Sequence, residues 1–409
     1  MNATARHPLS LAVLLAALAA VGPFSIDAYL PAFPEISAAL SADSLQIQQT
    51  LSIYLVTFGL MTLWHGAFSD SFGRRRVVLV GIVVYALSAL GCAFSTSIEM
   101  LWTMRALQGL AAGTGMVVGR AIVRDLYEGA EAQRLIAQIA IMFAVAPAIA
   151  PMFGGWILHL VGWRAIFFFL ALASALLLLV CWRQLPESLP PEKRRPFAIL
   201  PLLASYRSIL SNPAFLVLSI GLGLFFGGFF IYVMSATAFI RQLLGLGATD
   251  FHWLFIPAMI GMMSGSWISG RVSGRWSDYR TLCVASAVMG AAACLNLLVS
   301  GFLPSWRIPA VLPIIGYNLG IAMAVPTVTL RGLDMFPQNR GTAASCQAFV
   351  QTIINSAIAA FAAPMLWGSR LNLSLGMAAF GGIGALLVLW QVRRAGEQRT
   401  EDRGQRTED

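Results

Sequence analysis

Long apolar runs separated by short polar gaps make up most of the chain. Each run holds about 20 residues, the length of α-helix that crosses ~30 Å of hydrocarbon. The pattern therefore predicts an all-α polytopic membrane protein with twelve transmembrane helices. We place the spans at residues 9–31, 45–67, 77–96, 99–121, 134–158, 163–183, 213–236, 251–273, 281–302, 308–331, 342–366 and 371–392.

Composition supports the same class. Of the 409 residues, 58% are hydrophobic and only 11% are charged, whereas about a quarter are charged in an average soluble domain. The formal net charge of +9 is compatible with nucleic-acid binding. However, the basic residues lie between apolar runs and form no patch interleaved with aromatic residues. We therefore expect a lipid bilayer around the protein and no nucleic-acid partner.

The basic residues also orient the chain. Most of the 27 Lys and Arg residues lie in polar gaps that share one side with both termini. Because cytoplasmic loops carry an excess of positive charge, both termini are predicted to be cytoplasmic. The opposite side holds only Arg164, Arg241, Arg307 and Arg370.

One polar gap is much longer than the others. Residues 184–211 contain several prolines and a run of three basic residues, which favours a cytoplasmic linker with a membrane-surface helix. This linker separates an N-terminal six-helix bundle at 1–183 from a C-terminal one at 212–393. Residues 394–409 have no apolar face, so we expect them to form a disordered cytoplasmic tail.

Asp27 is the acidic residue that lies clearly within a predicted span. A carboxylate in hydrocarbon is costly and therefore indicates a functional site, here one that takes up and releases protons. The alternative is an interfacial residue at a helix end, because Pro31 follows one turn later. The first run also resembles a cleavable signal peptide. Cleavage would remove or expose Asp27, so we favour an uncleaved first helix.

Arg105 is the basic residue within a span, at a depth similar to that of Asp27. It either extends outward to lipid headgroups or lies in the protein interior, and Gly109 and Gly113 favour a helix packed closely on a neighbour. Each charge alone would be costly. The sequence therefore predicts that Asp27 and Arg105 form one coupled site, in direct contact or with water or Gln108 between them.

The gap between the second and third spans is short and charged. Residues 66–76 read Gly-Ala-Phe-Ser-Asp-Ser-Phe-Gly-Arg-Arg-Arg. Gly66 allows close helix packing and Gly73 supplies a turn. Asp70 either pairs with an arginine or caps a helix N-terminus, and Arg74 follows the turn as the first of three arginines. In the fifth span, Pro147 and Pro151 predict a bend, and the following Gly154 and Gly155 predict a smooth packing face.

These motifs resemble those of the major facilitator superfamily. Residues 66–76 are similar to its G-x-x-x-D-x-x-G-R-[KR]-[KR] signature, residues 105–109 to its R-x-x-Q-G motif, and residues 150–155 to the antiporter motif G-P-x-x-G-G in an A-P-x-x-G-G form. Together with residues 124–127, 162–167 and 186–192, they resemble the Bcr/CflA branch of drug:proton antiporters. His65 and Ser71 depart from the family pattern.

The resemblance implies two six-helix bundles around a central cavity, with the hairpin and the fifth span as gating elements. It also implies proton-coupled export of small amphipathic drugs or toxic metabolites by alternating access, by a monomer without a cofactor. A proton-coupled uptake symporter or a metabolite exporter of the same fold is the alternative.

Residues that contact the substrate are harder to identify. Gln347, Gln351 and Asn355 recur every four residues and form one polar stripe, which faces either the cavity or another helix. The remaining candidates are polar or aromatic residues within spans, namely Tyr54, Gln108, Tyr232 and Asn318.

Other functional classes lack their signatures. The four histidines are scattered without metal-ligand spacing, the five cysteines form no paired pattern, and no catalytic cluster is recognisable. The chain has no phosphate-binding loop for ATP and no repeated filter sequence of the kind a channel needs. We therefore predict a secondary transporter with no catalytic or metal-binding residues.

Overall fold

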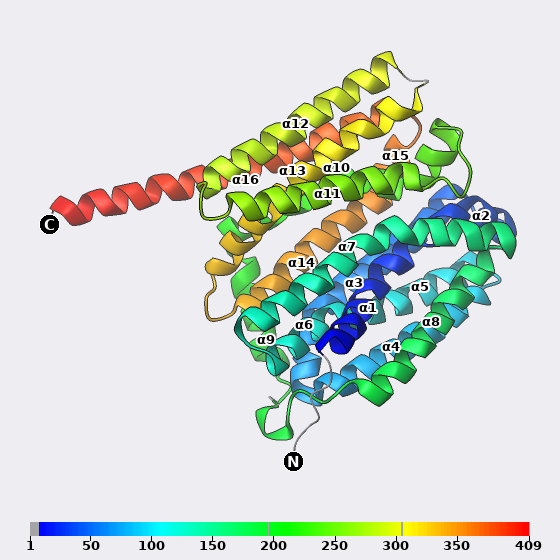
Figure 1. The fold of residues 1–409 in the computed structure, drawn as a ribbon, viewed down its shortest axis with the longest axis horizontal. Helices are drawn as coiled ribbons and strands as arrows, with labels where there is room; N and C mark the ends of the chain where they lie inside the picture. Colours follow the sequence, from blue (N-terminus) through cyan, green and yellow to red (C-terminus); the bar gives the residue numbers. More distant parts are fainter. Residues whose placement is uncertain (1–7, 195, 304–305, 409) are drawn as a thin grey trace. The chain divides into compact units, whose positions relative to one another are not determined.

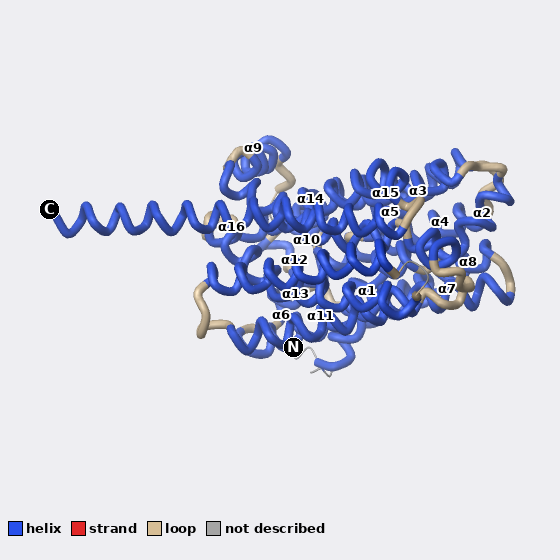
Figure 2. Tube along the Cα trace, turned by 90° about the horizontal axis from the view of Figure 1, so that it is seen from above, coloured by secondary structure: helices blue, strands red, loops and turns tan. Residues whose placement is uncertain are grey.

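The computed structural model describes residues 8–194, 196–303 and 306–408, and every regular element in these ranges is a helix (Figure 2). The chain forms two compact units. The N-terminal unit comprises Met1–Ile199 together with Gly245–Phe255, and the C-terminal unit comprises Leu200–Leu244 and Ile256–Asp409. The boundary between Ile199 and Leu200 lies inside the predicted linker.

The N-terminal unit is built from eight α-helices, drawn from blue to green in Figure 1. Within it α1 packs on α6 and α7, α3 packs on α5, and α4 packs on α5 and α8. The elements are α1 (Pro8–Asp27), η1 (Leu30–Ala32), α2 (Phe33–Leu40), α3 (Ser44–Phe72), α4 (Arg74–Ala93), α5 (Ile98–Ala112), α6 (Thr114–Leu126), α7 (Gly129–Leu160), α8 (Trp163–Gln184) and η2 (Pro191–Lys193).

In the C-terminal unit α10 packs on α14 and α16, and α12 packs on α13 and α16. Two of its segments, η3 and η4, are π-helical. The elements are α9 (Ile199–Leu210), α10 (Pro213–Met234), η3 (Ala238–Leu243), α11 (His252–Val272), α12 (Asp278–Phe302), α13 (Arg307–Asp334), α14 (Arg340–Ala357), η4 (Ile358–Ala362), α15 (Ala363–Leu366) and α16 (Arg370–Glu408).

Ten helices or helix pairs in the described residues are long and apolar enough to cross a membrane. They correspond to ten of the twelve predicted spans, and α7 and α11 occupy the positions of the other two, 134–158 and 251–273. The fold is therefore the predicted all-α polytopic bundle. Local signals define helix starts. For example, Asp43 accepts a hydrogen bond from the backbone nitrogen of Gln46, and the Gln46 side chain accepts one from that of Asp43.

Some predicted spans are interrupted. The first helix ends at Asp27, and a 3-10 turn then leads into α2. Pro31 and Pro34 explain this interruption, because proline removes a backbone donor and disfavours helical geometry in the residue before it. The fourth span divides at Gly113 into α5 and α6, and π-helical η4 interrupts the eleventh.

Helix α16 continues as far as Glu408, beyond the last predicted span, which ends at residue 392. Whether residues 394–409 form a disordered cytoplasmic tail stays a prediction. Adding a residue to an existing helix needs no new nucleation step. The Arg, Gln and Glu residues of this segment also favour helix, which explains why a segment without an apolar face extends the last span.

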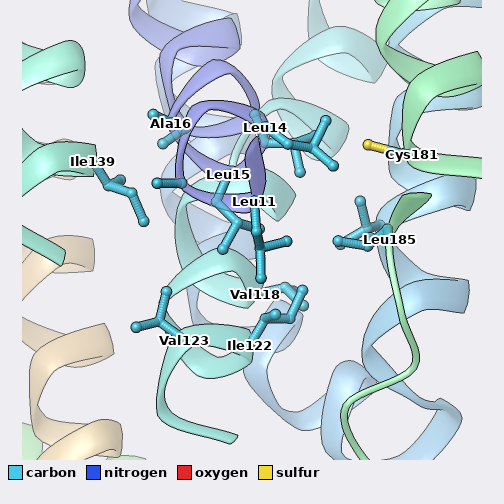
Figure 3. Close-up of a cluster of buried hydrophobic side chains, with 14 of the residues drawn as sticks. Leu11, Leu14, Leu15, Ala16, Val118, Ile122, Val123, Ile139, Cys181 and Leu185 are labelled. Carbon is cyan, nitrogen blue, oxygen red and sulfur yellow. The ribbon is translucent and has the colours of Figure 1, made fainter. Parts of the chain in front are cut away.

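The core of the N-terminal unit surrounds α1 (Figure 3). Leu11 and Leu15 on α1 belong to one buried cluster with Val118 and Ile122 on α6. Gly115 allows this contact, because an added Cβ at that position would meet the backbone of Leu18. The packing holds α1 and α6 close together. Both helices carry residues of the candidate site described below.

Candidate functional site

Arg105 lies in the interior of the N-terminal unit and is fully buried. Its helix, α5, packs closely on α3, because a Cβ added at Gly109 would meet the backbone of Tyr54 and the side chain of Thr57. This geometry confirms the predicted close packing of the helix. It also excludes the alternative in which Arg105 extends outward to lipid headgroups.

The guanidinium of Arg105 is held by polar atoms and by two aromatic rings. Nη1 donates to the Gln108 Oε1 at 2.6 Å and to the Ser25 Oγ at 3.2 Å. The guanidinium carbon lies 4.4 Å from the ring centroid of Tyr29 and 4.2 Å from that of Tyr54. Such cation–π contacts stabilise a desolvated arginine without neutralising its charge. Nε and Nη2 have no hydrogen-bond partner in the described part of the chain.

The two tyrosines are fixed by hydrogen bonds of their own. The hydroxyl of Tyr29 lies 2.6 Å from the Thr50 Oγ1, and that of Tyr54 donates to the Gly22 carbonyl at 3.1 Å. Tyr54 and Gln108, predicted as substrate contacts, are therefore partners of Arg105 in this structure. Ser25 and Tyr29 were not predicted as site residues, although both belong to the segment around Asp27.

Asp27 is the last residue of α1 and is 4% exposed. Its Oδ1 is buried and has no hydrogen-bond partner in the described residues. The ion pairs of these residues do not include one between Asp27 and Arg105. Successive helical residues are rotated by about 100°, so Ser25 and Asp27 face different directions. Arg105 therefore contacts the last turn of α1 through Ser25, and of the predicted alternatives the direct contact with Asp27 is not formed.

Arg74 is the centre of a charged network at the hairpin between α3 and α4. Its side chain pairs with Asp70, donates to the Ser69 Oγ at 2.6 Å and donates to the Asp125 Oδ2 at 3.0 Å. The pairing of Asp70 with an arginine is thus confirmed. Gly73 adopts a φ of 95°, a left-handed conformation that favours glycine, as its predicted turn requires. No atom would meet a Cβ at Gly66, so close packing at that glycine is not observed.

The linker contributes to the same network. Glu187 Oε1 accepts from the backbone nitrogen of Arg74 at 2.9 Å, and its Oε2 lies 3.7 Å from Arg194 Nη2. Ser188 donates to the Asp125 Oδ2 at 2.8 Å. Glu187 thus satisfies a free backbone donor in the first turn of α4 from 113 positions away in the sequence. Sequence reasoning missed Asp125 and Glu187 as members of this site.

Helix α7 remains continuous through Pro147 and Pro151. Gly154 and Gly155 of this helix lie close to the backbone of other segments. A Cβ added at Gly154 would meet the backbone of Ala28, and one added at Gly155 would meet that of Ala248. The predicted smooth face is therefore present, and part of it lies against the residue that follows Asp27.

Tyr232 and Asn318 lie in the interior of the C-terminal unit and are buried. The Tyr232 hydroxyl accepts from the Asn296 Nδ2 at 2.8 Å, so this tyrosine belongs to a network that joins helices. Asn318 Nδ2 donates to the Ile314 carbonyl of its own helix at 2.9 Å, while its Oδ1 has no partner in the described residues. Asn318 therefore retains a free polar atom.

The polar stripe lies on α14. Gln347 is buried, whereas Gln351 and Asn355 are half-buried. Gln347 Nε2 and Asn355 Oδ1 have no hydrogen-bond partner in the described part of the chain. Of the two predicted roles, hydrogen bonding between helices is thus not observed for these atoms, and they remain free to bind another group.

The chain is similar to known transporters over most of its length. Residues 13–360 match the sequence profile of the Major Facilitator Superfamily. An uncharacterized MFS-type transporter of Bacillus subtilis is 35% identical over 87% of this chain and 89% of its own length. Multidrug resistance protein D of Escherichia coli is 29% identical over 91% and 93%. A chloramphenicol resistance protein of Pseudomonas aeruginosa is 32% identical over 81% and 80%.

Solved structures show the same fold. The crystal structure of a D-xylose-proton symporter matches with a TM-score of 0.74 at 15% sequence identity, covering 94% of this chain and 97% of that one. At this level of identity the likeness extends to the fold alone.

Proposed function

Because the chain belongs to the Major Facilitator Superfamily, and is thus a multi-pass membrane transporter, we propose that it exports small amphipathic drugs in exchange for protons. The names of its multidrug and chloramphenicol resistance relatives support drugs as substrates. The excess of Lys and Arg in the polar gaps on one side supports cytoplasmic termini, and the bacterial relatives support a bacterial plasma membrane location.

The observation that carries proton coupling is the Asp27 carboxyl. It is buried, and its Oδ1 lacks a hydrogen-bond partner. An unpaired buried carboxylate is expensive, and a bound proton would remove that charge. Asp27 ends α1, on the turn that Arg105 contacts through Ser25. Binding of a proton would therefore change the charge of a turn that a buried arginine already contacts.

A proton affects transport only if it binds two conformations with different affinity. We place the moving contact at Gly154, where α7 meets the backbone of Ala28 next to Asp27. The network around Arg74 serves as a latch on the cytoplasmic side, because its ion pairs tie α3, α4 and α6 together. Release of these pairs would allow the helices to separate.

For the substrate contacts we retain the groups whose polar atoms are free. These are Asn318 on α13 and Gln347 and Asn355 on α14. Gln351 is retained with them because it lies between the two on the same stripe. Amides without protein partners in an apolar helix are suited to hydrogen-bonding a polar group on an otherwise apolar drug.

The test is transport by purified protein in liposomes with radiolabelled chloramphenicol as the probe. An outward or inward proton gradient is imposed, and accumulation is measured with and without a protonophore. Antiport predicts that chloramphenicol moves against the direction of the protons and that the protonophore abolishes accumulation. We expect Asp27→Asn to lower gradient-driven accumulation about 100-fold while chloramphenicol binding survives without its pH dependence.

Glu35→Gln is the matched control, because Glu35 is the next acidic residue along the chain. If Glu35→Gln abolishes coupling and Asp27→Asn does not, the proton-binding acid has been wrongly assigned. Movement of chloramphenicol together with protons would instead identify a symporter. Accumulation that is independent of any gradient would refute proton coupling altogether.

A further inference from the structure

Three tryptophans of the C-terminal unit are each followed by an arginine four residues later, and no other tryptophan of the sequence has a basic residue at that position. The pairs are Trp267 with Arg271, Trp276 with Arg280 and Trp390 with Arg394. In the structure each guanidinium carbon lies over the ring of its own tryptophan, at 4.2, 4.7 and 5.4 Å from the centroid. Stacking of this kind positions an arginine and leaves the N–H donors at its edge free to bind an anion.

Two of these pairs lie on helices that are neighbours. Helices α12 and α16 pack along each other (Figure 1). Ser374 Oγ donates to the Ser300 Oγ at 2.6 Å, and Asn296 Nδ2 lies 3.3 Å from the Met377 sulfur. As residue numbers fall along α12 they rise along α16, so the two helices are antiparallel.

This register brings the two arginines to the same level. Arg280 precedes Asn296 by about 24 Å of helix, and Arg394 follows Met377 by about 26 Å. Both helices are continuous over these stretches, and both distances run toward the same end of the unit. Packed helices lie about 8–10 Å apart, so two arginine side chains at one level can contact a single small group between them.

The face of α16 that leads to Arg394 is apolar and exposed. Ile383, Leu386 and Trp390 are spaced by three and four residues, so they form one stripe, and Arg394 continues it. The helix is long and apolar enough to cross a membrane, and tryptophan is enriched at the level of lipid headgroups. The stripe thus presents apolar side chains, then an amphipathic ring and then a cation, which is the order that matches acyl chains, glycerol and phosphate.

The carboxylates near this end of the unit have other partners. Asp278 accepts from Arg331 at 2.7 Å, and Asp334 accepts from Arg340 at 2.7 Å. The ion pairs within the described residues include neither Arg280 nor Arg394. The two stacked arginines therefore present positive charge that no described carboxylate neutralises.

The hairpin of the N-terminal unit is arranged differently. Arg74 is paired with Asp70 and Asp125. Arg75 approaches Trp182, but it donates to the backbone carbonyl at 2.6 Å. The stacked and unneutralised arginines are thus a feature of the C-terminal unit.

We infer that the end of the α12–α16 pair at Arg280 and Arg394 binds the phosphate of an acidic glycerophospholipid, whose acyl chains lie along the exposed stripe of α16. Guanidinium donors bind phosphate oxygens strongly, and basic sites between membrane helices suit anionic headgroups. A zwitterionic lipid carries a cation next to the same phosphate, which the arginines repel, so the site selects a net negative headgroup. The inference goes beyond the proposed export, because lipid binding is measured without drug or proton gradient.

The test uses the full-length protein, purified in detergent and freed of bound lipid. Dioleoylphosphatidylglycerol and dioleoylphosphatidylcholine are added separately, and native mass spectrometry gives the dissociation constant of the first bound lipid. We expect phosphatidylglycerol to bind at least about tenfold more tightly than phosphatidylcholine. Equal binding of the two lipids would overturn the inference.

Variants then locate the site. Arg280→Gln and Arg394→Gln should each weaken phosphatidylglycerol binding about fivefold. Trp390→Leu keeps the charge and an apolar side chain but removes the ring under Arg394, so we expect about a threefold loss. Phosphatidylcholine binding should stay unchanged in all three. The ratio of the two lipids is compared, because damage to the fold would weaken both alike.

Arg275→Gln is the matched control, because Arg275 is an exposed arginine between α11 and α12 that stacks on no described ring. It removes the same charge and should change binding less than about twofold. A loss equal to that of Arg280→Gln would show a general attraction to the basic surface, and the site would be refuted. Glycerol phosphate, which lacks acyl chains, should not displace the lipid. Its displacement of phosphatidylglycerol at equal concentration would make free phosphate the ligand and overturn the assignment to lipid.

Discussion

The two units differ in what they bury. Among the acidic and basic side chains of the described residues, the N-terminal unit buries Asp27, His65, Arg74 and Arg105, whereas the C-terminal unit buries Arg370. The other buried polar groups of the C-terminal unit are neutral, and some of them bond one another. Ser374 Oγ, for example, donates to the Ser300 Oγ at 2.6 Å.

The hairpin between α3 and α4 and the one between α11 and α12 show the same contrast. Arg74 in the N-terminal unit is 9% exposed by its side chain and contacts two carboxylates. The corresponding segment 270–280 has Gly274 in a left-handed turn with a φ of 74° in place of the aspartate. Its Asp278 pairs with Arg331, but both side chains are substantially exposed. Burial strengthens an ion pair by excluding water, so the ion pairs of Arg74 are stronger than the exposed pair of Asp278 and Arg331. Under the proposed function, the N-terminal unit would respond to protons and the C-terminal unit would provide a neutral surface for the substrate.

The largest effect is expected when the buried arginine of each unit is replaced, because the two units are then compared at their buried charges. Arg105→Met keeps a long apolar chain but removes charge-assisted hydrogen bonds to Ser25 and Gln108. Two such bonds are worth about 3 kcal/mol or more, so gradient-driven transport should fall at least about 100-fold. The measurement is chloramphenicol accumulation in liposomes, with protein content checked by quantitative blotting.

Arg370→Met provides the comparison in the C-terminal unit. Arg370 is also buried, and its Nη2 donates to the Trp306 carbonyl at 3.1 Å. Transport by this variant should remain within about threefold of the unmodified rate, because the charge lies outside the proposed coupling site. Equal losses in both variants would show that buried charge supports the fold alone, and the contrast between the units would disappear.

The hairpins provide a second, smaller test. Asp70→Asn keeps the shape of the side chain but weakens its bond to Arg74, while the arginines that set topology remain. Asp70 is 44% exposed, so solvent already screens part of this interaction, and we expect about a tenfold loss of transport. Asp278→Asn is the matched change at the exposed pair of the other hairpin and should alter transport less than about twofold. If the two variants transport alike, the latch has no special role.

Local patterns in the sequence predicted much of the fold and part of the site. Hydrophobic runs give helix positions because lipid requires about 20 apolar residues for each span. Asp70 and Arg74 lie four residues apart, a spacing that brings side chains together on or near a helix end. Gly73 also predicted its turn locally, because glycine readily adopts the backbone conformation that a turn requires. In each case the responsible residues are neighbours in the chain.

The remaining features depend on distance and on helical rotation. Glu187 reaches Arg74 across 113 positions, and no periodicity in either segment indicates that contact. Both Asp27 and Arg105 lie near the end of α1. Depth does not give the direction in which a side chain points, and Ser25 rather than Asp27 faces the arginine. Whether the two charges are functionally coupled stays a prediction.

The mildest test concerns Tyr232, a predicted substrate residue that the structure places in the neutral network of the C-terminal unit. Tyr232→Phe removes the hydroxyl that accepts from Asn296, while the Asn296 Nδ2 keeps its 3.3 Å contact with the Met377 sulfur. The loss of one neutral hydrogen bond should lower the free energy of unfolding by about 1 kcal/mol and leave the transport rate within about twofold. Thermal unfolding of the purified protein and chloramphenicol transport are measured on the same preparation. Unchanged stability together with altered transport or drug preference would instead place Tyr232 among the substrate contacts, and the C-terminal unit would then use its paired polar groups for binding as well as for packing.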